Sequence, residues 1–297
     1  MDLRQMRYFT TVVQQKNFSK AAQLLHVSQP SLSNAISKLE KEVGFPLLER
    51  NTRSLHLTDS GKIMYERALE LLNKFDHLTK EMKEVKQTGS GHLSLGLIES
   101  AKHWMPKVIH HFKGDFPNIK IQLLELLGVE QVQQSLLNYE THAAITNQMV
   151  THRDLLAYPI YNERLVLLVH FQNELSQRPT ITMKDLEREP FIISTSGFQT
   201  RKDILHAFDK EQASPNIMYE IERFETACSL VEEGLGVTII PENYIKYSTF
   251  PSIRPRYIQS EALQRTVYLA HSKNRYLPPF IHSFLNHTTN FLKSENS

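Results

Sequence analysis

The stretch FSKAAQLLHVSQPSLSNAISKLEKEVGFPLLERNTRSLHLTDSG, residues 18–61, decides the fold of the N-terminal part of this chain. Near its start stand two adjacent small residues, Ala21 and Ala22, which allow another helix to cross closely. Ser19 is a suitable N-cap for a short helix around them. Upstream, apolar residues recur at helical spacing over residues 3–13, which predicts a first helix with an apolar face. These patterns predict two helices that pack against each other.

A third helix is predicted from about Gln29 to Glu42. Ser28 is a preferred N-cap residue, and Pro30 falls in the first helical turn, where its missing N–H costs nothing. The core-facing stripe of this helix is Leu32, Ile36 and Leu39. Its other face carries the polar residues Gln29, Ser31, Ser33, Asn34, Ser37 and Lys38. Such a face can enter a major groove and read base edges, although a solvated face of an ordinary three-helix domain is the alternative.

The segment that follows this helix predicts a wing. Residues 46–58 read as a strand, a turn that carries Arg50 and Arg53, and a second strand with alternating leucines. The two arginines are suited to phosphate contacts, which set affinity and register without reading sequence. Residues 1–58 carry eight basic and four acidic side chains, whereas the whole chain has a net charge of only +2. The basic excess therefore lies at the N-terminus, as expected for a DNA-binding part.

Taken as one block, residues 18–61 resemble the LysR-type transcriptional regulators. The shared features are the paired alanines, the SQP–SLS entry to the third helix, the LE near its end and the LxxRxxRxxxLTxxG wing. The resemblance implies DNA contacts in the head at Ser28, Gln29, Pro30, Ser31, Ser33, Asn34, Arg50 and Arg53, and Lys38 on the same polar face completes the predicted set. The chain departs from the family at Asn34 and Ala35, where Arg followed by Gln is common. Asn can still pair with adenine, but a guanine- or phosphate-binding Arg is missing there.

A long linker helix is predicted from Asp59 onward, because no proline interrupts residues 59–88. Apolar residues spaced alternately four and three apart form a heptad seam, which predicts a partner helix. The seam consists of Met64, Ala68, Leu71, Phe75, Leu78, Met82 and Val85. Packing of this helix on its own C-terminal domain is the alternative, and the family resemblance favours a homodimer or a homotetramer. Residues 87–91 then read as a flexible hinge.

The rest of the chain alternates strand-like and helical runs, which is typical of α/β layering. The predicted strands cover residues 92–98, 120–126, 143–145, 163–169, 191–194, 217–222, 237–240 and 265–270. The predicted helices cover residues 104–112, 130–137, 183–187, 201–210, 226–233 and 278–292. The resemblance extends more weakly through FKGDFPNIKIQL, ITMKDLEREPFII and LVEEGLGVTIIPE, and implies two α/β lobes like those of periplasmic binding proteins.

The expected architecture is thus an all-α winged helix-turn-helix head joined to an α/β body. The head comprises residues 1–58, the linker and dimerisation helix 59–88, and the effector-binding domain 89–297. Within that domain the first lobe is expected at about 91–162 and 268–297, and the second at about 163–267.

Ligands of such lobes bind where strand carboxyl ends and helix N-termini face a crevice. This rule points to the segments 99–101, 146–148 and 194–197. The predicted effector-binding residues are Ser100, Gly128, Thr146, Thr195, Ser196, Arg201 and Thr226. Arg201 suits a carboxylate metabolite, which it would hold as a clamp. An ordinary helix N-cap is the alternative role of each hydroxyl residue.

Enzyme motifs are missing from the sequence. It contains no GxxxxGK[ST] phosphate loop, no GxSxG elbow, no dinucleotide fingerprint and no HExxH or paired-cysteine zinc spacing. Cys228 is the only cysteine and is expected to fill core space, so we expect neither a disulfide, a metal nor a cofactor. No signal peptide or run of about 20 apolar residues occurs, which favours the cytoplasm and no membrane contact.

The predicted function is sequence-specific regulation of transcription. The expected partners are double-stranded DNA with a pseudo-palindromic operator, a small-molecule effector, a second copy of the chain, and RNA polymerase if the regulator is an activator. A binding module that uses a DNA-like head for protein contact is the non-enzymatic alternative.

Overall fold

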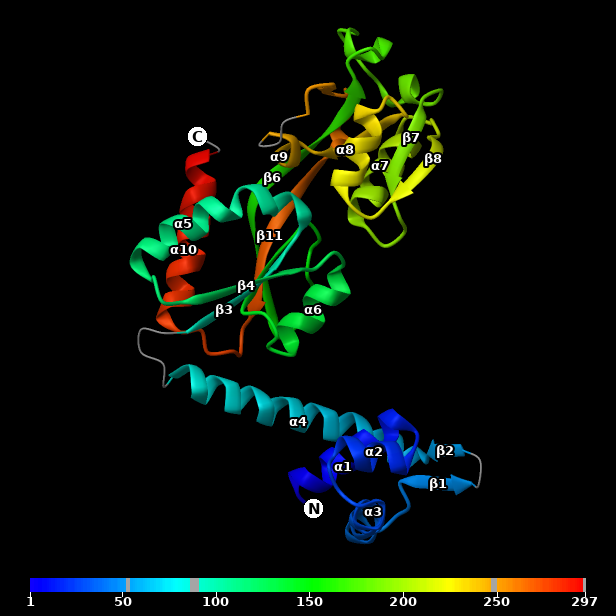
Figure 1. Ribbon diagram of the computed structural model, residues 1–297, viewed down its shortest axis with the longest axis vertical. Helices are drawn as coiled ribbons and strands as arrows, with labels where there is room; N and C mark the ends of the chain where they lie inside the picture. The colour runs from blue at the N-terminus through cyan, green and yellow to red at the C-terminus, as the bar shows by residue number, and fades with distance from the viewer. Residues whose placement is uncertain (52–53, 86–90, 247–249, 296–297) are drawn as a thin grey trace. The chain divides into compact units, whose positions relative to one another are not determined.

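The computed structural model describes residues 1–51, 54–85, 91–246 and 250–295. The chain forms two compact units, Met1–Lys83 and Glu84–Ser297, each with its own core. Figure 1 shows the three-helix head with its long helix and the mixed α/β unit. Among the described helices, none is both long and apolar enough to cross a membrane.

The head begins with helices α1 (Leu3–Gln15), α2 (Phe18–Leu24) and α3 (Gln29–Val43). Ser28 caps α3 as predicted, since its side chain accepts a hydrogen bond from the Ser31 backbone. The predicted cap of α2 is wrong. Asn17 rather than Ser19 holds that position, because the Asn17 side chain accepts from the Lys20 backbone N–H and starts the helix one residue before Ser19.

The core of the head confirms the predicted stripe of α3. Leu32, Ile36 and Leu39 are fully buried and pack with Phe9 of α1 and Ala21 of α2. Apolar burial of this kind stabilises by roughly 25 cal/mol per Å² removed from water, so the three residues anchor α3 and leave its opposite face outward.

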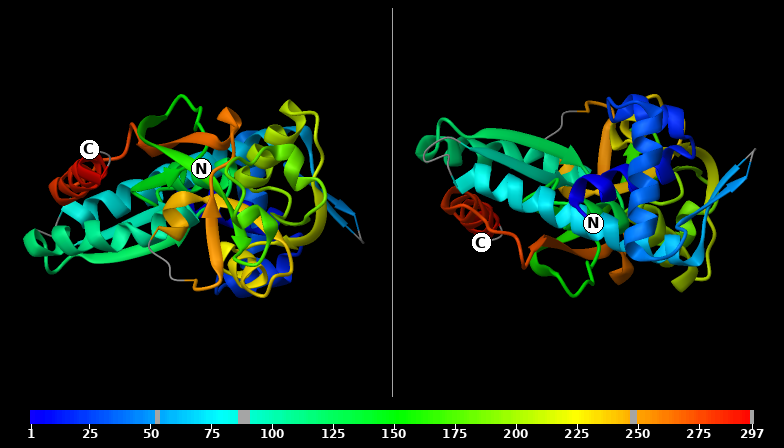
Figure 2. Two further views of the ribbon diagram at one scale, coloured as in Figure 1. Left: turned by 90° about the horizontal axis from the view of Figure 1, so that it is seen from above. Right: turned by 90° about the horizontal axis from the view of Figure 1, so that it is seen from below.

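The wing is the hairpin of β1 (Leu48–Asn51) and β2 (Ser54–Leu57), which pair antiparallel as predicted and project from the helices of the head (Figure 2). Glu40, the glutamate of the LE motif, explains how the wing is placed. Its Oε1 accepts hydrogen bonds from the backbone N–H groups of Leu47 at 2.8 Å and Leu48 at 3.1 Å. The motif thus couples the end of α3 to the start of the wing.

Helix α4 (Asp59–Val85) follows, and its N-terminal Thr58 accepts a hydrogen bond from the Gly61 backbone at 2.9 Å. A Cβ on Gly61 would lie 2.0 Å from the Leu47 carbonyl oxygen, so only glycine allows this close approach. Further along, α4 packs on α1 through Ala68 and Leu72 against Met6. The start of α4 is therefore part of the head.

The second unit is built on one mixed sheet in the order β4-β3-β5-β11-β6-β9-β7-β8, with β10 paired to β6. Its strands are β3 (His92–Leu97), β4 (Lys120–Glu125), β5 (Ala143–Thr146), β6 (Leu155–His170), β7 (Pro190–Ser194), β8 (Asn216–Ile221), β9 (Val237–Pro241), β10 (Ile253–Arg256) and β11 (Gln264–Ser272). β3 is parallel to β4 and β5, and β7 is parallel to β8 and β9. β6 pairs antiparallel with β9, β10 and β11.

The helices gather around separate cores at the two ends of this sheet. What we call the first lobe contains β3–β5 with α5 (Met105–Asp115), α6 (Val129–Leu137) and α10 (Pro279–Glu295). What we call the second lobe contains β7–β10 with α7 (Gln199–Lys210), α8 (Phe224–Glu232) and the short α9 (Glu242–Ile245). Short 3₁₀ helices occur at Glu99–His103, Glu174–Ser176, Met183–Leu186 and Glu261–Leu263. Strands β6 and β11 run through both lobes (Figure 1).

Two predicted elements of this unit differ from the structure. The strand predicted at residues 163–169 begins at Leu155, because a long antiparallel pairing with β11 extends it through Pro159 and polar residues that locally resemble a loop. The helix predicted at residues 183–187 is a single 3₁₀ turn, which Asp185 closes with a capping box at Thr182.

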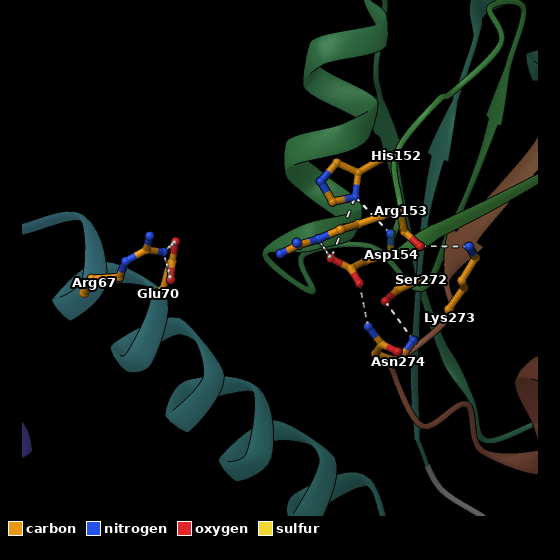
Figure 3. Close-up of polar contacts among 8 residues, drawn as sticks. All are labelled: Arg67, Glu70, His152, Arg153, Asp154, Ser272, Lys273 and Asn274. Atoms are coloured by element: carbon orange, nitrogen blue, oxygen red, sulfur yellow. Dashed lines mark hydrogen bonds and ion pairs between the residues drawn. The ribbon is translucent and has the colours of Figure 1, made fainter. Parts of the chain in front are cut away.

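The two connecting strands are tied together at the far end of the first lobe (Figure 3). Asp154 precedes β6 and accepts hydrogen bonds from Asn274 at 3.1 Å and Arg153 at 3.3 Å. Lys273, just after β11, donates to the Arg153 carbonyl at 2.8 Å. Partial burial raises the pKa of Asp154, but the bonds from Arg153 and Asn274 outweigh this effect and lower it overall, so the carboxylate is charged.

Candidate DNA interface and effector cleft

Helix α3 presents the predicted polar face outward. Gln29, Pro30 and Asn34 are exposed, and Ser33 is half-buried. Ser28 and Ser31 are exposed as well, but their hydroxyls lie 2.8 Å apart and serve the helix cap. The exposed side chains of this face that are free to contact base edges are therefore mainly the amides of Gln29 and Asn34, and amides pair well with adenine.

Charge on this face comes from Lys38. Its side chain is exposed, and its Nζ lies 4.0 Å from Glu42, one helical turn further on. So exposed an ion pair holds the lysine only weakly, and a phosphate can compete for it. Of the predicted wing contacts, Arg53 and the side chain of Arg50 lie outside the described residues.

The predicted dimer seam on α4 divides into two parts. Met64 and Ala68 pack inside the head, against residues of α1. Further along α4 the seam is exposed on the single chain, at 45 to 53% for Leu71, Phe75, Leu78 and Met82. The side chain of Val85 lies outside the described residues. A row of exposed large apolar residues at heptad spacing is the surface expected to meet another helix.

The second unit contains a small cavity between its lobes, about 20 Å³ in volume. The first lobe contributes Ile98, Glu99, Ser100, Leu127 and Asn147 to its walls. The second lobe contributes Phe198, Gln199, Thr200 and Phe224, and β11 contributes Arg265. Carboxyl ends of strands and N-termini of α7 and α8 thus meet at the cavity, as expected for α/β sheets.

Arg265 is the centre of a buried network beside this cavity. It donates to Glu163 Oε2 at 2.8 Å, to Thr200 Oγ1 at 3.0 Å and to Asp203 Oδ2 at 3.1 Å. With its amide oxygen turned toward the guanidinium, Asn147 accepts two further hydrogen bonds at 3.3 Å. The network joins α7 of the second lobe to β6, β11 and the first lobe.

Glu99 makes a second connection across the cavity. Its Oε1 accepts a hydrogen bond from the Phe224 backbone N–H, at the start of α8, at 3.0 Å. Burial, partly offset by this hydrogen bond, raises the pKa of Glu99 from 4.5 to about 7. The carboxylate therefore titrates in the physiological range.

Two more contacts join the lobes beside Glu99. Arg223, the N-cap residue of α8, forms an ion pair with Glu125 at the end of β4. The rings of His103 and Tyr244 meet edge to face, with centroids 4.8 Å apart. Several contacts besides the Glu99–Phe224 hydrogen bond thus join the two lobes.

Of the seven predicted effector residues, only Ser100 lies in the wall of this cavity. Thr146 instead accepts a hydrogen bond from the Gln148 backbone, Arg201 pairs with Glu220, and Thr226 is exposed on α8. Gly128 is the N-cap of α6, and after β7 follow the half-buried Thr195 and the exposed Ser196.

Sequence reasoning missed Arg265, Thr200 and Phe224 as wall residues. Arg265 lies in a strand that is distant in sequence from both lobes' other site residues, so no local pattern marks it. Glu99, in contrast, belongs to the predicted crevice segment 99–101, because it directly follows the first predicted strand of the domain.

Cys228 is fully buried in the second lobe, in the same core as Phe224 and Val231. Burial raises the pKa of its thiol to about 12, which keeps it protonated and unreactive. In the described part of the chain, no group of three or more His, Cys, Asp or Glu residues is arranged to hold a metal ion.

Comparison with known proteins covers both units. Residues 3–62 match the family "Bacterial regulatory helix-turn-helix protein, lysR family", and residues 86–293 match "LysR substrate binding domain". The uncharacterized HTH-type transcriptional regulator YcgK of Bacillus subtilis is 31% identical, over 99% of this chain and 95% of its own length. The probable cat1 operon transcriptional activator of Acinetobacter lwoffii is 31% identical, over 81% of this chain and 80% of its own.

Among solved structures, full-length CbnR in complex with its target DNA has the same fold, with a TM-score of 0.67 at 22% identity. The alignment covers 98% of this chain and all of CbnR. The two family matches, which together span most of the chain, and the 31% identity to YcgK show that this chain belongs to the LysR family of DNA-binding transcriptional regulators, which are not enzymes and carry an effector-binding domain.

Proposed function

We propose that two or four copies of this chain pair through the exposed seam of α4 and place their α3 helices on a pseudo-palindromic operator. The support for pairing is the row of exposed apolar residues from Leu71 to Met82. The support for base reading is the outward polar face of α3, with Gln29 and Asn34 exposed. Two-fold symmetry of the protein then matches two half-sites about one helical turn apart.

The cavity between the lobes is the proposed effector site. The observation that carries this proposal is that residues of both lobes form its walls. A ligand held by both lobes binds the closed arrangement better than the open one and therefore shifts the population toward closure. In a pair of chains, that shift changes how the two heads bind the half-sites of the operator.

The proposed place of action is the cytoplasm, where the bacterial chromosome lies. The name of the Acinetobacter lwoffii relative describes a transcriptional activator. If this chain also activates transcription, RNA polymerase is a further partner at the promoter.

Binding of a labelled duplex from upstream of the chain's own gene tests the proposal, measured by fluorescence anisotropy against a shuffled duplex. We expect specific binding that weakens on the order of a hundredfold or more between roughly 50 and 200 mM salt, because phosphate contacts release counterions. Equal affinity for the two duplexes would overturn sequence-specific regulation.

A head that contacts protein rather than DNA is the alternative. The triple variant Gln29→Ala, Ser31→Ala, Ser33→Ala separates the two, because these residues lie on the α3 face and not in the head core. Unchanged operator binding by this variant would show that the DNA interface does not lie on α3.

A further inference from the structure

The Glu99 carboxylate is largely buried and has one hydrogen-bond donor among the described residues. Glu99 is 8% exposed and lines the cavity between the lobes. Its only hydrogen bond among the described residues is the one from Phe224 to Oε1, so Oε2, which keeps some access to solvent, accepts none from the described part of the chain. A buried carboxylate is stable as an anion only when a positive charge or several donors surround it.

The charges near the cavity do not supply that compensation. Carboxylates outnumber cations there: the acidic residues are Glu99, Glu125, Glu163 and Asp203, and the basic ones are Lys102, Arg223 and Arg265. Arg265 is shared by Glu163 and Asp203, and Arg223 is paired with Glu125. Lys102 acts on Glu99 as well, but its side chain is exposed to solvent, which screens its charge. A carboxylate ligand would therefore enter a region that is already negative.

One of the two helix N-termini at the cavity, where an anion would bind, is already occupied. Helix N-termini attract anions through their free N–H groups and dipole. At the N-terminus of α8 the Phe224 N–H already serves Glu99. Arg201, the residue expected to clamp a carboxylate, is bonded to Glu220 and the Ser194 carbonyl and does not line the cavity.

A second group of the cavity lacks a partner. Ser100 is 1% exposed, and its Oγ makes no hydrogen bond in the described part of the chain. The volume of about 20 Å³ admits one group of the size of water, which is also the size of an ammonium group. Ile98 and Glu99 also line an adjoining hollow of about 430 Å³. Its other walls include the aliphatic Leu97 and Leu123 and the charged Lys102, Glu125, Arg223 and Glu225.

We infer that the effector of this cleft carries a protonated primary amine, which donates to Glu99 Oε2 and Ser100 Oγ, on a short aliphatic body. This inference rests on the proposed function, since it names the ligand class of the same cleft. The amine replaces the charge compensation that Glu99 lacks, and the aliphatic body lies against the walls of the adjoining hollow. A carboxylate effector, which Arg201 suggested from the sequence, is the alternative that the experiment decides.

The test uses the full chain and three four-carbon probes with different head groups: 1-aminobutane, butanoate and 1-butanol. Binding is measured by calorimetry and by the shift of the thermal unfolding midpoint. We expect 1-aminobutane to bind at least about tenfold more tightly than the other two, the size of effect of a charge-assisted hydrogen bond.

Two variants test where the amine binds. Glu99→Gln keeps the length of the side chain and removes its charge, so we expect it to lose the preference for the amine. Ser100→Ala should weaken amine binding by roughly three- to tenfold through the loss of one neutral hydrogen bond. Glu140→Gln is the matched control, because Glu140 is an exposed carboxylate of the first lobe that does not line the cavity, and it should bind like the unaltered chain.

The outcomes separate this inference from the proposed function. Tighter binding of butanoate than of 1-aminobutane overturns the amine and leaves the cleft as an effector site. Amine binding that survives Glu99→Gln unchanged also overturns the inference, because the ligand then lies elsewhere. Absence of binding by all three probes, with operator binding intact, overturns the inference together with the cleft as effector site, while the DNA-binding function stands.

Discussion

The carboxylate of Glu99, just after β3 in the first lobe, accepts a hydrogen bond from the backbone N–H of Phe224, the first residue of α8 in the second lobe, at 3.0 Å. The two residues are 125 positions apart in the chain, so this bond exists only when the lobes are together. It joins a buried acid to a helix N-terminus, where the helix dipole favours negative charge. Closure of the lobes and the ionisation of Glu99 are therefore linked.

Stability of the second unit should depend on pH through Glu99. Burial raises its pKa from 4.5 to about 7, so the folded chain holds this proton more tightly than the unfolded chain. The free energy of unfolding therefore falls as pH rises from about 4.5 to 7. Ionisation of Glu99 lowers the free energy of unfolding by on the order of 2–3 kcal/mol over this range. Thermal unfolding at pH 5 and pH 8 measures the loss.

Glu99→Gln provides the comparison, because the amide oxygen still accepts from Phe224 and carries no charge. We expect this variant to be more stable than the unaltered chain at pH 8 and about equally stable at pH 5. The same pH dependence in both proteins would show that Glu99 is not the group responsible.

Arg265 should be essential to the stability of the second unit. Glu163 is fully buried, and Arg265→Met leaves its charge and that of Asp203 without their cation. Loss of one partner from a buried ion pair costs about 3–5 kcal/mol. Urea unfolding followed by the fluorescence of Trp104, the only tryptophan and itself buried, measures the change. The double variant Arg265→Met, Glu163→Gln should be less destabilised than the single one. If it is no better, the ion pair is not the cause.

Gln29→Ala should reduce specific DNA binding without unfolding the head. Gln29 is exposed on α3, and loss of a bidentate contact to a base weakens binding by about 1–3 kcal/mol. Its affinity for a shuffled duplex should stay the same. Gln14→Ala, an exposed glutamine of α1, serves as the control. An equal loss of affinity for both duplexes would show that Gln29 contacts the DNA backbone rather than a base.

Phe75→Glu should separate the copies of the chain. Phe75 is 45% exposed in the middle of the seam, and a charge there must be desolvated when two α4 helices meet. We expect light scattering to report a monomer and operator affinity to fall. Lys80→Glu, an exposed position of α4 away from the seam, should leave the oligomer intact. An unchanged mass for Phe75→Glu would place the interface elsewhere.

The sequence predicts those features of the site that depend on residues close together in the chain, and it does not predict those that depend on residues far apart. Helix α3, its Ser28 cap and its buried stripe follow from spacings of three and four residues, and the structure confirms them. The cap of α2 was misassigned because Asn17 and Ser19 are both good caps, and only the backbone of the helix start chooses between them. In the cleft, Ser100 was predicted from its position after a strand, but Arg265 was not.

By itself, the sequence determined the winged helix-turn-helix head, the long α4 with its heptad seam and the alternation of strands and helices, because periodicity and caps act over a few residues. Tertiary structure alone decided the extension of β6 through Pro159, the network around Arg265 and the bond between Glu99 and Phe224. These depend on groups that folding brings together from distant parts of the chain. The charge of the cleft, and with it the kind of effector it suits, is the sum of such groups and is visible only once they are assembled.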